Sequence, residues 1–322
     1  MVSGPLAFFF KKKFMRRRAA ILLSFLWTLL WAVGSAYAHG VIGKAFIPST
    51  LTLDDPFPSD EMDLLSFNRA PQDSDGRQTS FGFEFGKRLT PDFAIGIGWQ
   101  YLLFDPRESG AGNPEFSLKY ALFRSPAHET IFSVGLGIEA GGVGPNRVAE
   151  RVTTISPTLL FGKGLGDLPD SLPYLKPFAV IGQWTANNPA NRTTGSGDDK
   201  EHNPNTIDYG LAVIYSVPYL QSFVRDVGIG APFDRMFPLV EFNFSTNVSN
   251  PNRGQTTAFV NPGVTWVGRY VELGLEAQVP MNNASGKNVG VRGLIHVFLD
   301  DLWPNIFTWT PWGVIGPTPT PK

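Results

Sequence analysis

The sequence predicts an all-β chain, a transmembrane antiparallel β-barrel of about 12 strands with a cleaved N-terminal signal peptide. Three observations predict this fold. An export signal opens the chain, and segments of about 10–14 residues then alternate large apolar residues with small or polar ones. The links between these segments are long at one end of the strands and mostly short at the other. A closed barrel explains this pattern because every backbone group in lipid must find a partner within the protein.

The N-terminal residues have the three parts of a secretory signal. Residues 11–18 carry six Lys and Arg, residues 19–34 are apolar, and Ala36 and Ala38 form an A-x-A cleavage site. The sequence therefore predicts a signal peptide over residues 1–38. The alternative is a retained helical anchor, since the apolar run approaches the ~18–20 residues that span a bilayer.

The composition and charge argue against a nucleic-acid partner, disulfide bonds and helical membrane spans beyond the signal. Cleavage would remove six of the 27 Lys+Arg and none of the 28 Asp+Glu, which leaves a net charge of −7. A nucleic-acid partner is not expected, because it would require a basic face. The chain has no cysteine and so no disulfide. Beyond the signal, no apolar run reaches the ~18 residues of a helical membrane span.

The strand prediction rests on a period of two. In "DFAIGIGWQYLL", Phe93, Ile95 and Ile97 alternate with small residues. Most segments are longer than the ~5–6 residues of an average strand and close to the ~9–11 that cross a bilayer when tilted. The expected strands are residues 62–70, 78–89, 92–104, 114–124, 129–141, 152–165, 174–187, 206–218, 234–247, 256–268, 270–281 and 289–300.

The lengths of the links predict how the strands are oriented in the cell envelope. The first, third and later odd links are polar and mostly long, whereas even links such as "TPD" and "GR" are tight. Outer-membrane barrels have their short turns on the periplasmic side. Within the long even link 218–232, apolar residues recur at i, i+3, i+4 and i+7. This spacing predicts an amphipathic helix at the periplasmic rim, with an ordinary loop as the alternative.

A soluble β-sandwich would also alternate, with its apolar face inward. It would not require long strands, a glycine-rich second face or a one-sided distribution of loops. These three features favour the barrel.

Ionisable side chains fall on the small, inward-facing set, as expected because charge on the lipid face is costly. They would either line a polar passage or cross-link a filled lumen as charge pairs. The lumen-lining candidates are Glu84, Lys119, Glu139, Glu241, Glu272, Glu276, Arg292 and His296.

The sequence gives no support for catalytic, cofactor or metal sites. Gly135-x-Gly137-x-x-Ala140 has dinucleotide-binding spacing, but no helix can begin directly after it. The alternation continues through it, so we interpret its glycines as relief of crowding inside the barrel. The four histidines show no metal-ligand spacing. A serine hydrolase built on His296 is a minor alternative, because the pattern supplies no serine partner.

Two motifs resemble a known family. "AFIPSTLTLDDPFPSDE", within residues 39–61, and "FLDDLWP", Phe298–Pro304, are similar to the ends of bacterial outer-membrane barrels of the family named for the meta pathway of phenol degradation. The resemblance implies an outer-membrane location and uptake of small apolar or aromatic compounds.

The predicted organisation is a signal peptide (1–38), a periplasmic N-terminal segment (39–61), a barrel (62–300) and an aromatic and Pro-rich tail (301–322). The expected function is a non-enzymatic, porin-like channel for small, apolar or aromatic solutes in the outer membrane of a Gram-negative-type envelope. Its expected partners are outer-membrane lipid, small solutes and the barrel-assembly machinery, in a monomer or small homo-oligomer. The alternative is a closed barrel with a structural or surface-interaction role through the loop at 188–205.

Overall fold

The structure, a computed structural model, describes residues 40–73, 76–105, 108–195, 197, 200–309 and 311. The predicted signal peptide lies outside these residues. Within them, no helix has the length and apolar character needed to cross a membrane.

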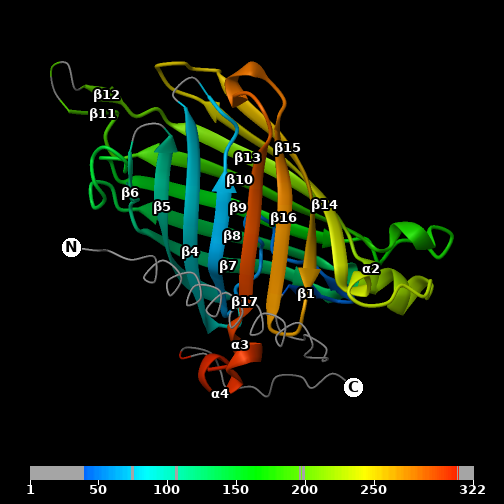
Figure 1. Ribbon diagram of the computed structural model, residues 1–322. Coiled ribbons are helices and arrows are strands. Elements are labelled where there is room, and N and C mark those ends of the chain that lie inside the picture. Colours follow the sequence, from blue (N-terminus) through cyan, green and yellow to red (C-terminus); the bar gives the residue numbers. More distant parts are fainter. Residues whose placement is uncertain are drawn as a thin grey trace, which may run out of the picture.

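Twelve antiparallel strands form a closed ring (Figure 1). The ring closes because β4 pairs with both β3 and β5, and β17 pairs with β3. The predicted fold is thus confirmed, with strand ends shifted by a few residues. The strands are β3 (Glu61–Arg69), β4 (Arg77–Thr90), β5 (Phe93–Asp105), β7 (Glu115–Ser125), β8 (Thr130–Glu139), β9 (Thr154–Gly164), β10 (Phe178–Pro189), β13 (Thr206–Tyr215), β14 (Met236–Asn247), β15 (Thr256–Val267), β16 (Val271–Pro280) and β17 (Gly290–Phe298).

Short strands lie within the long links. We call the end of the barrel that carries these links the extracellular end, after the usual loop pattern of such barrels. β6 (Ser109–Ala111) extends the sheet by pairing with β5. β11 (Thr193–Thr194) and β12 (Glu201–His202) form a separate two-stranded sheet in the longest link. These short strands were not predicted, because each is too short to show a period of two in the sequence.

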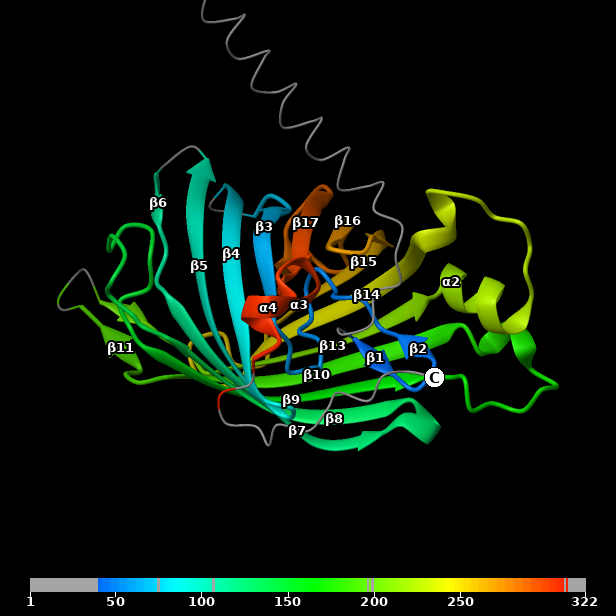
Figure 2. The same cartoon turned by 90° about the horizontal axis from the view of Figure 1, so that it is seen from below.

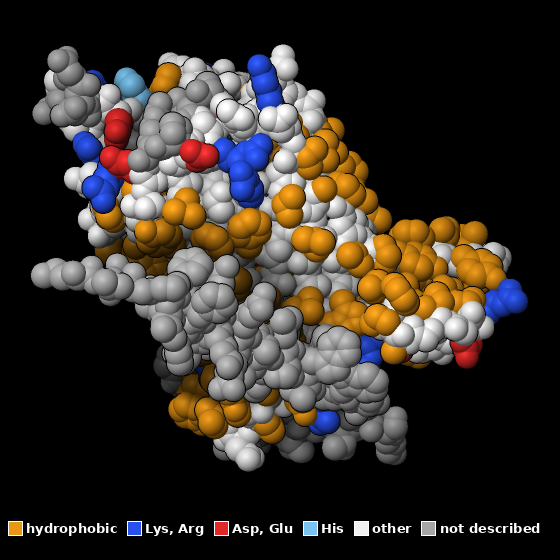
Figure 3. Space-filling view, viewed as in Figure 1, with side chains coloured by type: hydrophobic (Ala, Val, Ile, Leu, Met, Phe, Trp, Pro, Cys, Tyr) orange, Lys and Arg blue, Asp and Glu red, His pale blue; other side chains and the backbone are white. Residues whose placement is uncertain are grey.

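Alternate residues of the wall strands face opposite sides, with large apolar side chains outward and small or polar ones inward, as predicted. In β16, Leu275 is 58% exposed on the outer face, whereas its neighbour Glu276 is 2% exposed. Figure 3 shows hydrophobic side chains gathered on the outer surface of the strands. A closed barrel with an apolar outer surface is the architecture of an outer-membrane barrel.

The N-terminal segment differs from the prediction. Residues 39–61 were expected as a periplasmic lead, but the described residues 40–60 fold into the lumen (Figure 2). β1 (Val41–Ile42) and β2 (Ala45–Phe46) form a hairpin whose turn places Gly43 at φ +64°, a conformation that favours glycine. Residues 47–60, which we call the plug, then rise into the lumen and return to β3. The segment enters the barrel because its apolar side chains find a core there.

The periplasmic rim carries short helices. α2 (Val217–Tyr219) and a π-helical turn (Leu220–Val224) form the predicted rim helix, but it ends before Val227. α3 (Leu299–Leu302) and α4 (Pro304–Phe307) follow β17 and lie below the ring (Figure 1).

Candidate functional site: the plugged lumen

The plug backbone is held by a carboxylate of the barrel wall. The amide N–H groups of Leu51 and Leu53 donate to Glu241 Oε1 and Oε2, at 2.8 and 3.3 Å. Glu241 is 0% exposed. The plug is not part of a sheet, so its backbone donors need other partners when buried. Glu241 supplies them in the way that a side chain caps a helix end.

Further polar contacts tie the plug to neighbouring strands. The Ser49 N–H donates to Glu272 Oε2 at 3.4 Å, and Arg292 donates to the Leu51 carbonyl at 3.4 Å. Asn261 Nδ2 donates to Thr52 Oγ1 at 3.1 Å. The Asp54 N–H donates to Gln183 Oε1 at 2.7 Å, on the opposite side of the lumen. These bonds therefore cross the lumen and position the plug between β10 and β14–β17.

Apolar packing adds to these contacts. Ile47, Leu53 and Phe57 belong to one buried cluster with wall residues such as Ile181 and Ile214. Wall glycines make room for the plug. A Cβ on Gly274 would lie 2.5 Å from Leu51 Cδ1, and one on Gly210 would lie 2.5 Å from Leu53 Cδ2.

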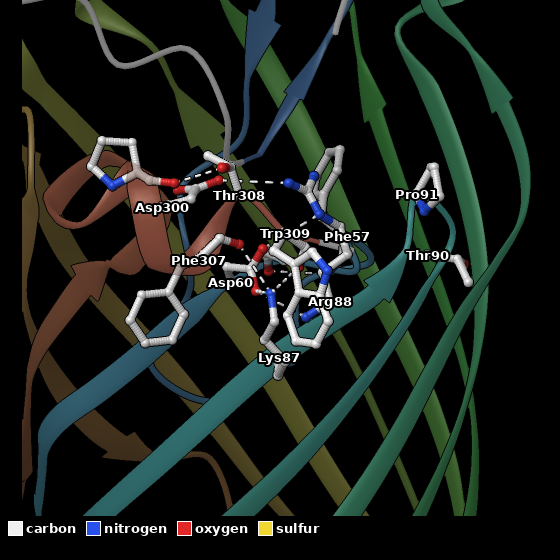
Figure 4. A network of polar contacts seen from close by, with 12 residues as sticks. Phe57, Asp60, Lys87, Arg88, Thr90, Pro91, Asp300, Phe307, Thr308 and Trp309 are labelled. Atoms are coloured by element: carbon white, nitrogen blue, oxygen red, sulfur yellow. Dashed lines mark hydrogen bonds and ion pairs between the residues drawn. The ribbon is translucent and has the colours of Figure 1, made fainter. Parts of the chain in front are cut away.

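An ionic network anchors the plug where it joins β3 (Figure 4). Asp60 is 0% exposed and accepts from Lys87 Nζ at 2.5 Å and from the Arg88 N–H at 3.1 Å. Lys87 also donates to the carbonyls of Phe307 and Trp309, and the Arg88 guanidinium lies 3.8 Å from Asp300. The network therefore joins the plug to the C-terminal segment that contains "FLDDLWP".

His296 belongs to a second buried cluster. Its Nδ1 lies 2.7 Å from Asp63 Oδ1 and its Nε2 lies 3.7 Å from Glu61 Oε2. Glu272 stands opposite His296 in the β16–β17 register. Among the described contacts of His296 there is no serine hydroxyl.

All eight predicted lumen residues lie on the inner face, but they separate into two environments. Glu241, Glu272, Glu276, Arg292 and His296 are packed around the plug or beside it, with Glu276 opposite Arg292 in register. Glu84 and Lys119 also line an open cavity, where Lys119 lies 3.8 Å from the plug carboxylate Asp55, and Glu139 accepts a hydrogen bond from Asn113 at 2.9 Å near the extracellular end.

This cavity lies on the side of the lumen that the plug leaves free. Its volume is about 240 Å³, and it runs along the inner faces of β4 to β13, from the extracellular side at Glu115 and Asn187 to Gly86 and Ala94. The plug residues Asp54, Phe57 and Ser59 form its other wall. A second cavity of about 220 Å³ adjoins it and shares Gln183 and Asp208.

Several cavity residues were not predicted as site residues, among them Glu115, Gln183 and Asp208. Their parity is the same as that of the predicted set, so a rule that included every polar inward residue would have found them. Gly135 and Gly137 also line this cavity. A Cβ at Gly135 would meet only ordinary contacts at 3.4 Å, whereas one at Gly137 would lie 3.0 Å from Glu115 Oε1, so crowding does not explain Gly135.

Within the described ranges, no group of three or more His, Cys, Asp or Glu could hold a metal ion.

Comparison with known proteins supports the fold. No family model and no curated protein matches the chain. An outer-membrane channel from Pseudomonas putida F1 is similar over 76% of this chain and 97% of its own, with 11% identity and a TM-score of 0.52. The NanC and KdgM porins cover 73% and 72% of this chain, and 98% and 97% of their own, with 8% and 9% identity and TM-scores of 0.45 and 0.42. The first likeness shows the shared barrel fold. The resemblance to the phenol-degradation family stays a prediction.

Proposed function

We propose that this protein is a passive outer-membrane channel for small polar solutes in which the plug controls passage. The observation that carries the proposal is the polar cavity that runs beside the plug from the extracellular side toward the Asp60 network. A barrel that served only as a structural element would not need a water-accessible cavity along its inner wall.

The way in which the plug is held fits a movable element. Its contacts to Glu241, Glu272, Asn261 and Gln183 are hydrogen bonds that water can replace. Each is worth only ~0.5–1.5 kcal/mol net, somewhat more when an ionised group takes part. A small displacement of the plug would therefore widen the path without disturbing the ring, whose strands, in the part of the chain that the structure describes, pair only with one another and with β6.

The polarity of the lining defines the solutes. The resemblance implied apolar or aromatic compounds, but the cavity is lined mainly by Ser, Thr, Asn, Gln and carboxylate side chains. Small hydrophilic solutes therefore fit this lumen better.

The test is to lock the plug to the wall. Thr52 and Asn261 are in hydrogen-bond contact and the chain has no native cysteine, so Thr52→Cys with Asn261→Cys gives two unique adjacent thiols. A short bifunctional thiol reagent that can be cleaved by reductant would bridge them. In proteoliposomes we expect solute flux from the reduced protein, loss of most flux on bridging, and recovery on reduction.

Each single-cysteine variant treated with the same reagent is the control for added bulk. If the reduced, folded barrel passes no solute and no ion current, the channel proposal is wrong. Equal flux from bridged and reduced protein would show instead that the plug does not control passage.

The alternative, surface interaction, has one structural feature in its favour. The β11–β12 hairpin extends away from the barrel at the extracellular end (Figure 1). Deletion of this link should leave flux intact if the protein is a channel, and should abolish partner binding if the hairpin is the functional surface.

A further inference from the structure

The two lumen cavities adjoin each other beside the plug. They meet at Gln183 and Asp208, on the neighbouring strands β10 and β13. Thr52 and Leu53, at the top of the plug, form part of the floor of the smaller cavity. Together the two cavities fall within the ~300–1,000 Å³ of ordinary small-ligand pockets.

The smaller cavity contains amide groups that lack a protein partner. Asn243 is 9% exposed and Gln278 is 4% exposed, and both line this cavity. Within the described part of the chain, Asn243 Oδ1, Asn243 Nδ2 and Gln278 Oε1 form no hydrogen bond. A buried polar group without a partner destabilises the protein, so these atoms favour a bound group that both donates and accepts.

An aromatic ring lies beside these amides. Phe259 is the register partner of Asn243, and it lines the same cavity. Hydroxyl groups both donate and accept hydrogen bonds, as the amides require. The C–H face of a saturated ring could pack on Phe259. The combination of amides and one aromatic face thus fits a hydroxylated ring better than a fully apolar molecule.

The larger cavity adds a preference for positive charge. Five carboxylates line it, those of Asp54, Glu61, Glu84, Glu115 and Asp208, against the single ammonium of Lys119 among its described lining residues, and Arg292 adds one cation in the lining of the smaller cavity. Lys119 lies 3.8 Å from a sixth carboxylate, that of Asp55. Glu84 and Glu115 are exposed to the lumen. One Asp208 oxygen accepts from Asn187 Nδ2 at 2.6 Å, and the other is buried without a hydrogen bond. A cleft lined by one sign of charge concentrates ions of the opposite sign.

We propose that this two-lobed cavity binds a small aminated polyhydroxyl compound, such as an amino sugar. Its hydroxyl groups occupy the lobe of Asn243, Gln278 and Phe259, and its ammonium group faces Asp208 and the carboxylates of the larger lobe. The proposal deepens the proposed function by naming the class of solute, and therefore rests on it.

Three probes of one ring size test the proposal: glucosamine, which is cationic, glucose, which is neutral, and glucuronate, which is anionic. Binding is measured by titration calorimetry on the full-length protein in detergent, which does not depend on transport. We expect glucosamine to bind about tenfold more tightly than glucose, and glucuronate to bind more weakly than glucose. Flux in proteoliposomes is measured separately, so a failed binding prediction is distinguishable from a failed channel.

Variants locate the site. Asp208→Asn should bring the affinity for glucosamine down to that for glucose, and Asn243→Leu should weaken both sugars. Glu115→Gln gives a second test of the carboxylate lobe if Asp208→Asn does not fold. Asp226→Asn removes a carboxylate from the periplasmic rim and should change neither affinity.

Three outcomes would overturn the proposal. The first is the absence of saturable binding of any probe, which would mean that water alone fills the cavity. The second is equal affinity for glucosamine and glucuronate. The third is binding that Asp208→Asn, Glu115→Gln and Asn243→Leu all leave unchanged in folded protein.

Discussion

At the scale of single residues, the same inward parity produces two different roles. Glu241 is completely buried and serves the backbone of the plug, whereas Glu84 and Glu115 face a lumen that water can reach. The difference comes from the plug, which fills one side of the barrel and leaves the other free. Glycines follow the same division, since Gly274 lies against Leu51 and Gly135 borders the cavity.

This division predicts unequal effects of adding bulk to the wall. Gly274→Val should displace Leu51 and destabilise plug docking by ~1–3 kcal/mol, as overpacking does. Gly135→Val should have little effect because its side chain enters the cavity. The rate at which a thiol reagent labels a single Thr52→Cys should rise about tenfold in the first variant and stay unchanged in the second. Equal labelling rates would show that Leu51 does not hold the plug.

The inward parity of these residues could be predicted from the sequence, but their partners could not. A period of two places Glu241 and Glu272 inside the barrel whatever occupies the lumen. The donors to Glu241 are Leu51 and Leu53, and Leu51 lies 190 residues away in sequence. The plug has neither helical nor strand periodicity, so no local signal shows that it enters the lumen. Its buried Ile47, Leu53 and Phe57 are spaced irregularly because it follows the shape of the lumen rather than a regular element.

At the scale of elements, the plug and the C-terminal segment are held together by one ionic network. Asp60, at the end of the plug, and the carbonyls of Phe307 and Trp309, after β17, share the same cation, Lys87. In the sequence, both motifs stand out only through a family resemblance. The structure shows a physical reason for their joint presence, since each supplies part of one network.

Removal of this cation should therefore loosen both elements together. Lys87→Met would leave Asp60 with Arg88 alone and would free the two carbonyls beyond α3. Limited proteolysis should then cut faster within residues 299–309, and ion conductance should increase. Lys176→Met, which breaks a surface pair with Asp170, is the matched control and should change neither. Faster proteolysis without any change in conductance would show that the Asp60 network holds the C-terminal segment but does not control passage.

At the scale of the whole molecule, the ring of strands determines how the barrel lies in the membrane. The strands were predicted almost completely, because the lipid face and the lumen face impose opposite requirements on alternate residues. The extracellular hairpin β11–β12 and the short rim helix were less predictable. Their few residues meet water or loops and carry no such alternation.

Depth in the bilayer predicts the cost of charge on the outer face. Changing Leu275, in the middle of β16, to Arg should lower the free energy of unfolding by ~2–4 kcal/mol. The same change at Leu103, near the end of β5, should lower it by only ~0–1 kcal/mol. Reversible urea unfolding in the presence of lipid vesicles measures both changes. A larger cost at Leu103 than at Leu275 would contradict the placement of the barrel in the membrane.

The direct continuity of the plug with β3 has a kinetic consequence. Residues 47–60 can extend at most ~50 Å, so a released plug stays tethered within a short radius of its own binding site. Its return is intramolecular, and a short tether gives an effective concentration in the millimolar range. If the plug controls passage as proposed, many weak hydrogen bonds can then keep the channel closed at rest. Opening becomes a brief event whose duration depends on how fast the plug recaptures its site, independent of how many barrels share the membrane.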